Sequence, residues 1–318
     1  MSKVLVTGGA GFIGSNLSRM LLDEGNEVIL YDNLSSGYRE NVQALPGAKF
    51  IEGDIRNASL LTEVMRDTDT VFHLAASVGN ARSIAYPIED SEINVIGTLQ
   101  VLEAARAQDV RKIVFSSSAG IFGELKSLPI REDHPVEPNS PYGASKLAAE
   151  KMCLAYAQLY QLEAVCLRYF NVYGINQRYD AYGSVIPIFA HRLLRGEALT
   201  VFGNGEQTRD FINVRDVAKA NLQASQTRSV SGAFNIASGS AITVNRLIEV
   251  MSAAGEISPA VEYGPLRSGD VRHSRADVSA AREAFGFQPS VKLEEGLSEY
   301  MRWSKSAAAS QHCAPLGL

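Results

Sequence analysis

Two residues that lie four positions apart, Tyr142 and Lys146, carry side chains suited to proton transfer. They occur in the sequence Pro-Tyr-Gly-Ala-Ser-Lys, where a proline precedes a helical pattern, so both side chains should share one helix face. A free phenol is a poor base at neutral pH because its pKa is about 10. A neighbouring ammonium group would favour the phenolate and lower that pKa. A surface Tyr-Lys pair on an amphipathic helix is the alternative.

Three serines, Ser116 to Ser118, end an apolar run that is typical of a buried strand. Open α/β folds bind their ligands at the carboxyl edge of the sheet. A hydroxyl at this edge could pass a proton between a substrate hydroxyl and Tyr142. Alternatively, the serines belong to a loop and bond only to its own backbone.

A glycine-rich turn follows the first predicted strand and opens a helix. Its residues Gly8, Gly9, Gly11 and Gly14 satisfy both GxGxxG and GxxGxxG. Glycines let the backbone approach a pyrophosphate, which then lies at the helix N-terminus. Asp32 ends the next predicted strand, 18 residues after Gly14, where a carboxylate binds the ribose hydroxyls of NAD rather than NADP. A positively charged nicotinamide ring would lower the pKa of Tyr142 further. A turn kept for packing, with Asp32 as a turn residue, is the alternative.

Alternating strands and helices must position these residues. Strands are predicted over 4–7, 28–31, 49–52, 70–74, 112–116, 165–168 and 234–236, and helices over 12–24, 95–108, 144–160 and 186–195. This alternation predicts an α/β fold with a Rossmann-type, doubly wound parallel sheet and a smaller mixed C-terminal substrate domain. We expect the NAD-binding domain over 1–174, with a return near 212–237, the substrate domain mainly over 175–303, and a flexible tail over 304–318.

Composition excludes several classes of protein. The 318 residues are 46% apolar and 20% charged, which is typical of a soluble globular chain. A net charge of −5 argues against nucleic-acid binding. Cys153, Cys166 and Cys313 have neither zinc nor disulfide spacing, so we expect no metal and a cytoplasmic location. The start of the given sequence has no basic segment followed by a long apolar one, and the apolar runs are far shorter than a membrane helix, so we expect neither a secretory signal nor a membrane span.

Seven motifs together resemble one family. They are TGGAGFIGS, Asp32-Asn33, Gly53-Asp54-Ile55, His73-Leu-Ala-Ala76, Ser-Ser-Ser118, YGASK and Arg168-Tyr-Phe-Asn171. From residue 3 to residue 303 the chain resembles an extended short-chain dehydrogenase/reductase and is most similar to the UDP-hexose 4-epimerases. In that family a tightly held NAD takes hydride from C4 of the sugar and returns it to the other face of a 4-keto intermediate. The resemblance implies that Tyr142 is the base, Lys146 its electrostatic partner and a ribose ligand, and Ser118 a proton relay.

The resemblance also implies a set of cofactor contacts. Asp54 and Ile55 would flank the adenine, Leu74 to Ala76 would line the cofactor channel, and Tyr169 would pack near the nicotinamide. Asn94 matches the start of the family's Asn-Val-x-Gly-Thr helix. The alternative is that Asn94 is only an N-cap residue. The full implied set is Gly8, Gly11, Phe12, Ile13, Gly14, Asp32, Asn33, Asp54, Ile55, Leu74, Ala75, Ala76, Asn94, Ser116, Tyr142, Lys146 and Tyr169.

The implied substrate contacts lie mainly in the C-terminal half. Arg209 and Arg267 would clamp the diphosphate, Phe202 would pack on uracil, and Asp270 would bind the uridine ribose. Ser274 would stand where a tyrosine blocks a 2-acetamido group and a small residue admits it. We therefore expect UDP-GlcNAc/UDP-GalNAc interconversion, with UDP-Glc/UDP-Gal as a second activity. The full implied set is Ser118, Asn171, Ser184, Phe202, Arg209, Arg267, Asp270 and Ser274.

The two residues after Ser118 distinguish epimerisation from the reactions of related enzymes. Ala119 and Gly120 stand where related 4,6-dehydratases have an Asp-Glu pair and decarboxylating relatives a glutamate, so we expect epimerisation. Phe122 stands where the family usually has tyrosine, with no evident functional meaning. Alternatives are a UDP-glucuronate 4-epimerase using Arg82 and Ser83, another NAD-dependent nucleotide-sugar enzyme, or a non-catalytic NAD-binding scaffold.

The helices predicted over 95–108 and 144–160 carry apolar residues on more than one face. In the family these helices form a four-helix dimer interface, and twofold pairing is the commonest assembly. We therefore expect a homodimer; packing of both helices on the sheet alone is the alternative.

Overall fold

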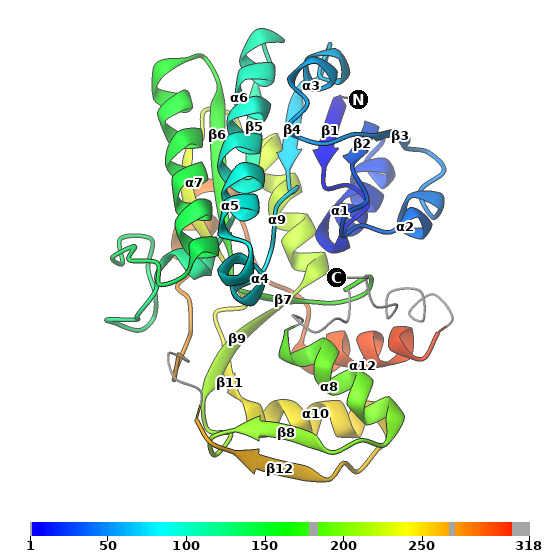
Figure 1. Cartoon of the computed structure of the whole chain (residues 1–318). Coiled ribbons are helices and arrows are strands. Elements are labelled where there is room, and N and C mark those ends of the chain that lie inside the picture. The colour runs from blue at the N-terminus through cyan, green and yellow to red at the C-terminus, as the bar shows by residue number, and fades with distance from the viewer. Residues whose placement is uncertain (1, 178–183, 267–270, 307–318) are drawn as a thin grey trace.

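The computed structural model describes residues 2–177, 184–266 and 271–306. Its largest element is a seven-stranded parallel sheet of order β10-β6-β5-β4-β1-β2-β3. The sheet confirms the predicted Rossmann-type fold class (Figure 1). Its strands are β1 (Lys3–Thr7), β2 (Glu27–Asp32), β3 (Lys49–Glu52), β4 (Thr70–His73), β5 (Lys112–Ser118), β6 (Glu163–Tyr169) and β10 (Gly232–Ile236).

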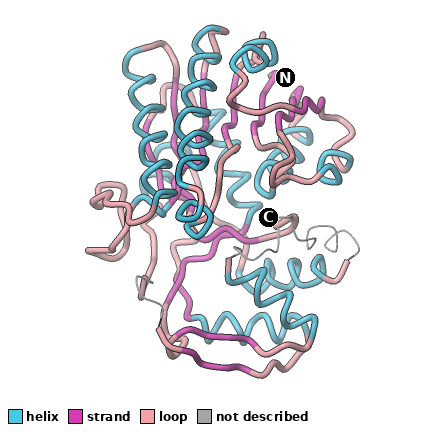
Figure 2. Tube along the Cα trace, viewed as in Figure 1, coloured by secondary structure: helices cyan, strands magenta, loops and turns pink. Residues whose placement is uncertain are grey.

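Helices cover both faces of this sheet, as Figure 2 shows. Alternate residues of β1 separate the two cores: Val4 and Val6 pack with α1 and α9, whereas Leu5 packs with α3, α6 and α7. Burial on both faces requires the near-continuous apolar strands seen in the sequence. The helices that cover the sheet are α1 (Phe12–Asp23), α3 (Ala58–Val64), α6 (Thr98–Ala107), α7 (Pro141–Leu159) and α9 (Val214–Gln226).

Short segments connect these elements around the carboxyl edge of the sheet. They are α2 (Arg39–Gln43), α4 (Asn80–Ala85), α5 (Pro87–Ser91), the π-helix η1 (Glu92–Gly97) and the 3₁₀ turn η2 (Ala119–Ile121).

A smaller region follows β6. It holds a three-stranded sheet of order β11-β9-β7 and a two-stranded sheet of β12 and β8, with a separate core that includes Phe189, Leu247 and Leu297. The chain returns from it to the large sheet through α9 and β10, where α11 packs. The elements of the smaller region are β7 (Asn171–Tyr173), α8 (Val185–Arg195), β8 (Leu199–Phe202), β9 (Thr208–Asn213), β11 (Ala241–Thr243), α10 (Val244–Gly255), β12 (Val261–Gly264) and α12 (Leu293–Ser304), whereas α11 (Ser279–Phe285) belongs to the core of the large sheet.

Three boundaries differ from the sequence predictions. The helix predicted over 95–108 is the end of a longer helical run, and Asn94 lies inside η1, so the N-cap interpretation of Asn94 is wrong. The helix predicted from 144 begins at Pro141 because the Ser140 hydroxyl caps it by accepting a hydrogen bond from the Gly143 amide at 3.1 Å. α12 ends at Ser304, the first residue of the expected tail.

Within residues 2–177, 184–266 and 271–306, none of the helices has both the length and the apolar character needed to cross a membrane. The same residues contain no group of three or more His, Cys, Asp or Glu side chains arranged to hold a metal ion.

Candidate active site

The glycine turn lies between β1 and α1, beside the point where the strand order reverses. β1 has β2 on one side and β4 on the other, and open α/β sheets bind ligands in the crevice at such a switch point. A Cβ on Gly8 would approach the Ala75 amide nitrogen to 2.7 Å, and a Cβ on Gly14 would approach the Gly8 carbonyl oxygen to 2.1 Å. Only glycine therefore allows the turn to pack this closely against both β4 and α1.

The N-terminus of α1 is suited to a pyrophosphate. Its N-cap is Gly11, so no side chain caps the first turn, and no acidic residue lies in it. Phe12 and Ile13 begin the helix and are half-buried. Unsatisfied backbone amides and the positive end of the helix dipole therefore face an open glycine turn, and both favour an anion.

Asp32 ends β2 next to this turn and is buried. Its Oδ2 accepts from the Ala10 amide at 3.0 Å and its Oδ1 from the Leu34 amide at 2.8 Å. Burial raises the pKa of this carboxyl, and the two amide bonds oppose the rise. Each oxygen keeps a lone pair for another donor. The carboxylate thus fits the predicted ribose ligand, and with the glycine turn it gives a set of groups that fits NAD.

Three further predicted cofactor residues lie around β2 and β3. The Asn33 amide donates to Asp54 Oδ2 at 2.9 Å. Arg56 donates to both oxygens of Asp54, and this holds the pKa of that carboxyl well below its usual range. Ile55 is buried against η1, where a Cβ on Gly97 would meet its Cδ1 at 2.5 Å. Asp54 is therefore fixed by protein donors, and its main role in this structure is to hold the loop after β3.

The loop after β4 lies against the glycine turn. Leu74, Ala75 and Ala76 are half-buried; the Ala75 amide donates to Thr7 Oγ1 at 3.3 Å. Asn94 is buried, accepts from the Ser77 amide at 2.8 Å and donates to the Ser77 carbonyl at 3.0 Å. Asn94 thus acts as a clamp on the loop that would line the cofactor channel.

Tyr142 and Ser118 meet at the carboxyl edge of β5. Ser118 is the last residue of β5, and Tyr142 lies in the first turn of α7. The Ser118 oxygen accepts from the Gly120 amide at 3.1 Å, and a Cβ on Gly120 would lie 3.3 Å from Ser118 Oγ and 3.6 Å from the Tyr142 ring. The two side chains therefore lie beside the same point, as a proton relay requires.

Lys146 lies one turn further along α7 and is 2% exposed. Its ammonium group stands 4.3 Å from the centre of the Phe115 ring, and burial lowers its pKa to about 8. His73 of β4 is also fully buried beside it, and burial, followed by the charge of Lys146, lowers the pKa of His73 to about 3. The imidazole is therefore neutral, and it bonds to Thr7 at 2.7 Å and to Thr98 at 3.0 Å.

The predicted fall in the pKa of Tyr142 does not hold for the chain by itself. Burial raises that pKa, and the charge of Asp90 adds to the rise, while the Ser118 hydroxyl lowers it. The reason is that the free energy lost when the phenolate is removed from water exceeds the free energy that it gains from its protein contacts. The neutral phenol is therefore the form that the chain by itself favours at neutral pH.

A second polar network lies behind the Tyr142–Lys146 face. Glu150 of α7 accepts from Ser117 Oγ at 2.6 Å and from Arg168 Nη2 at 2.7 Å. The Arg168 guanidinium lies 5.3 Å from the centre of the fully buried Phe122 ring. Phe122 is thus a core residue packed on Arg168, where a tyrosine hydroxyl would need a polar partner.

Two predicted cofactor residues lie close to this network. Ser116 is buried in β5. Tyr169 is buried at the end of β6, and its hydroxyl bonds to Asn221 of α9 at 3.0 Å. Burial raises the pKa of Tyr169 well above the usual range. Its hydroxyl therefore stays protonated, and Tyr169 is a packing residue rather than an acid or base of the reaction.

The smaller region places several predicted substrate residues around β9. Asp210 is fully buried and accepts from the amides of Ser238, Gly239 and Ala276, which joins β9 to the segment that carries Ser274. Arg209 precedes Asp210, and the side-chain amide of Asn171 donates from Nδ2 to the Asp210 backbone carbonyl at 3.0 Å. These bonds bring Asn171, Arg209 and Ser274 onto adjacent segments.

Ser274 lies beside β9, whereas Phe202 and Ser184 lie on other segments of the smaller region. Ser274 is 8% exposed, and its amide donates to the Thr208 carbonyl at 3.2 Å. Phe202 ends β8 and is half-buried. Ser184 precedes α8 and accepts from the Gln177 amide at 3.1 Å. Arg267 and Asp270 lie outside the described residues.

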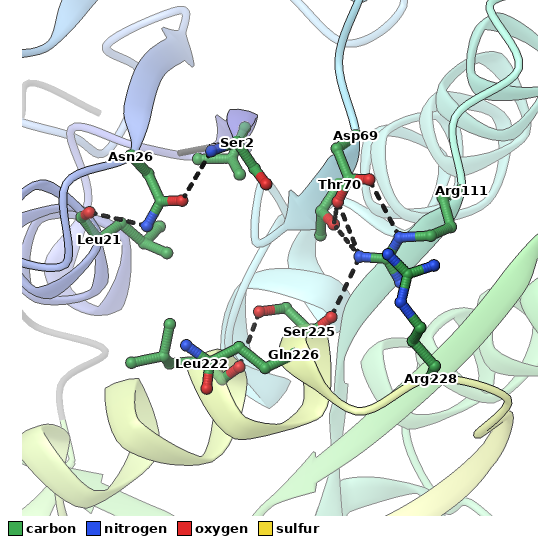
Figure 3. A pocket seen from close by; sticks show the side chains of 11 residues that line it. Ser2, Leu21, Asn26, Asp69, Thr70, Arg111, Leu222, Ser225, Gln226 and Arg228 are labelled. Atoms are coloured by element: carbon green, nitrogen blue, oxygen red, sulfur yellow. Dashed lines mark hydrogen bonds and ion pairs between the residues drawn. The ribbon is translucent and has the colours of Figure 1, made fainter.

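A cavity of about 200 Å³ lies at the opposite, amino-terminal edge of the sheet (Figure 3). Arg111 faces it but is bonded to both oxygens of Asp69, to Thr70 and to the Ser225 carbonyl. The cavity is distant from the glycine turn and from Tyr142, because those residues follow the carboxyl ends of the strands. Most of the Arg111 guanidinium is thus occupied by protein acceptors, although its Nη1 has no hydrogen-bond partner.

Sequence reasoning missed the buried polar residues that support the site. Glu150 follows Lys146 by one helical turn, so the i, i+4 spacing could have indicated it. Asp90 and Thr98 carry no such signal, since their partners Ser145 and His73 are distant in sequence.

Comparisons with known proteins agree with this geometry. Residues 4–237 match the model of the NAD dependent epimerase/dehydratase family. A UDP-glucose 4-epimerase of Mycolicibacterium smegmatis is 37% identical over 310 residues, which cover 96% of this chain and 99% of the relative.

Two solved structures are also similar. The UDP-N-acetylglucosamine 4-epimerase of Methanobrevibacter ruminantium, in complex with UDP-N-acetylmuramic acid, has a TM-score of 0.91 and 38% identity, covering 95% of this chain and 97% of its own. The UDP-glucose 4-epimerase of Thermotoga maritima with UDP-glucose has a TM-score of 0.90 and 39% identity, covering 95% of this chain and 98% of its own.

Proposed function

Because the chain belongs to the NAD dependent epimerase/dehydratase family, we propose that it is a UDP-sugar 4-epimerase that inverts C4 of a UDP-hexose through a 4-keto intermediate. The observation that carries the proposal is that Ser118 and Tyr142 both lie beside Gly120, with Lys146 on the same helix as Tyr142. NAD is the cofactor, and Gly8, Gly14 and Asp32 form the turn and carboxylate that fit it.

Each residue of this group has a distinct part in the reaction. Tyr142 takes the proton of the C4 hydroxyl and later returns it, and Ser118 passes that proton or holds the hydroxyl in line. Lys146 supplies positive charge that favours the phenolate. The bound NAD supplies the hydride acceptor and donor. The protein must then bind the diphosphate end firmly while the sugar turns, a task we assign to Asn171, Arg209 and Arg267.

The residues after Ser118 support epimerisation rather than elimination of water or decarboxylation. A Cβ on Gly120 would lie 3.3 Å from Ser118 Oγ and 3.6 Å from the Tyr142 ring. A carboxylate at this position would therefore act directly on the substrate. The chain has Ala119 and Gly120 here, which offer no group for a second proton transfer.

We propose UDP-GlcNAc/UDP-GalNAc as the preferred pair, with UDP-Glc/UDP-Gal as a second activity. The basis is the small side chain at Ser274, which the bonds of Asp210 hold beside β9. Serine leaves room for a 2-acetamido group where a tyrosine would fill it. Ser184 and the exposed Val78 add no long charged side chain.

UDP-glucuronate is a weaker candidate on structural grounds. Its C6 carboxylate requires a free cation or hydroxyl group, and the sequence offers Arg82 and Ser83 for this contact. Arg82 pairs with Glu89 at 3.3 Å, and the buried Ser83 donates to the Asn80 carbonyl at 2.9 Å. Both groups thus have partners within α4 and α5.

We also propose a homodimer formed through α6 and α7. Ala144, Ala148, Ala155 and Leu159 form an apolar stripe along α7 that the described residues leave at least partly exposed, with Leu159 72% exposed. Paired with its symmetry mate, this face would give a four-helix bundle. Light scattering at micromolar concentration should give the mass of a dimer; a monomer would exclude it.

The function is tested without added cofactor. Purified protein is incubated separately with UDP-GlcNAc, UDP-Glc and UDP-glucuronate, and the anomeric protons are followed by NMR. Formation of a galacto epimer indicates an epimerase that recycles bound NAD, and the relative rates rank the substrates. Retention of NAD with no conversion of any sugar would favour a non-catalytic scaffold.

A further inference from the structure

The turn of α7 that carries Tyr142 and Lys146 is bonded to a buried carboxylate from another helix. Ser145 lies between the two catalytic residues in the sequence, and its hydroxyl donates to Asp90 Oδ2 at 2.6 Å. Asp90 belongs to α5 and is 1% exposed. A hydrogen bond between a hydroxyl and a carboxylate is among the stronger bonds available to a helix face, so it fixes the rotation of this turn.

Asn94 extends the same network to the cofactor channel. Its amide nitrogen donates to Asp90 Oδ1 at 3.2 Å and to Ser145 Oγ at 3.0 Å. Its other contacts hold Ser77 in the loop after β4. Asp90 therefore lies at the centre of a network that joins the catalytic helix to the channel wall.

Asp90 is also one of the acidic groups whose charge acts on the buried Lys146. The titratable groups that face Lys146 are Asp90 of α5, Glu150 and Cys153 of α7, Cys166 of β6 and His73 of β4. Glu150 is neutralised by Arg168, and His73 is uncharged. Within the described part of the chain, Asp90 forms no ion pair of 4 Å or less with any cation, Lys146 included, so its charge is not used by another partner. A buried ammonium is costly unless a counter-charge is near.

We propose that Asp90 is a positioning residue of the reaction, which holds the Tyr142–Lys146 turn through Ser145 and supplies the buried counter-charge of Lys146. This inference rests on the proposed function for its catalytic consequence. Asp90 touches neither substrate nor cofactor and acts through residues that do.

The negative charge of Asp90 shifts two pKa values in the same direction. It raises the pKa of Tyr142, and it opposes the lowering of the Lys146 pKa by burial. Asp90→Asn keeps an oxygen for Ser145 but removes the charge, so both limbs of the bell-shaped pH profile of kcat/KM should move to lower pH by about half a unit or more. Ser145→Ala is the matched control, because it removes the hydroxyl bond and keeps the charge. It should lower kcat without moving either limb to lower pH.

A second readout does not depend on turnover. The phenolate of Tyr142 is titrated by ultraviolet absorbance as the difference between each protein and its Tyr142→Phe counterpart. The Tyr142 pKa should be lower in Asp90→Asn than in the wild type. If the wild type forms no epimer, the proposed function fails, while this titration still tests Asp90. An unmoved Tyr142 pKa, or the same acid shift in Ser145→Ala, would overturn the inference.

Loss of folding in Asp90→Asn is also informative. If the variant unfolds because Lys146 is left without a counter-charge, the double variant Asp90→Asn/Lys146→Met should fold again, as judged by circular dichroism and thermal unfolding. A double variant that remains unfolded would contradict the counter-charge role.

Discussion

The Glu150 carboxylate and the Arg168 guanidinium form a buried ion pair, with 2.7 Å between Oε1 and Nη2 and side chains 0% and 5% exposed. The pair joins α7 to β6, and Ser117 of β5 donates to the same carboxylate. The strand that ends in Ser118 and the helix that carries Tyr142 are thus held together by charge as well as by packing. Several consequences of this arrangement can be measured.

Removing one member of the pair should be costly. Arg168→Met leaves Glu150 as an uncompensated buried charge, so we expect a loss of about 3–5 kcal/mol in the free energy of unfolding. Urea unfolding followed by circular dichroism measures it. Arg195→Met breaks the exposed pair with Glu197 and should cost no more than about 1 kcal/mol. Equal losses in the two variants would refute the distinction between buried and exposed pairs.

Lys146 should make stability depend on alkaline pH. Its pKa is about 8 in the folded chain against 10.5 ordinarily, so between these values the unfolded chain binds the extra proton. The free energy of unfolding of nucleotide-free protein should therefore rise with pH across this window, by up to about 3 kcal/mol relative to Lys146→Met. If the free energy of unfolding changed in the same way with pH in both proteins from pH 8 to 10.5, the pKa of Lys146 would not be lowered by folding.

Tyr142→Phe should abolish most of the activity and leave NAD bound. Loss of a general base typically costs about 10²- to 10⁴-fold in rate, and phenylalanine keeps the shape of the ring. The measurement is the epimerisation rate by NMR together with the nucleotide released on denaturation. If the variant retained more than a tenth of the wild-type rate, Tyr142 would not be the general base.

Gly14→Ala should disrupt the cofactor site. The added Cβ would lie 2.1 Å from the Gly8 carbonyl oxygen, so α1 must move away from the turn. We expect NAD affinity to fall by at least about tenfold, which corresponds to about 1.4 kcal/mol. In the control Gly47→Ala, the new methyl group meets only the flexible Leu22 side chain, at 3.3 Å. Normal NAD content in both variants would contradict the packing argument.

Ser274→Tyr should change the substrate preference. The larger ring would fill the space that we assign to the 2-acetamido group. The rate with UDP-GlcNAc should therefore fall by at least about tenfold relative to the rate with UDP-Glc. A steric mismatch of this kind in a binding pocket costs about 1–3 kcal/mol. The rate with UDP-Glc serves as the internal control for folding. An unchanged ratio of the two rates would mean that Ser274 does not gate the sugar pocket.

Much of the fold follows from short-range patterns in the sequence. Apolar runs predict the central strands, and the glycine spacing predicts the turn between β1 and α1, because both depend on neighbouring residues. The Tyr142–Lys146 spacing predicts a shared helix face for the same reason. The order of the motifs predicts the family, and residues 4–237 match its model.

The tertiary structure decides which polar groups meet inside the molecule. Asp90 and Ser145 are 55 residues apart, and Glu150 and Arg168 are 18 residues apart on different elements. Arg82 is paired with Glu89, and Asn94 acts as a loop clamp rather than a helix cap. The raised pKa of Tyr142 likewise depends on burial by several segments. Local periodicity carries no record of these contacts, because burial and electrostatic fields arise only when distant segments pack together.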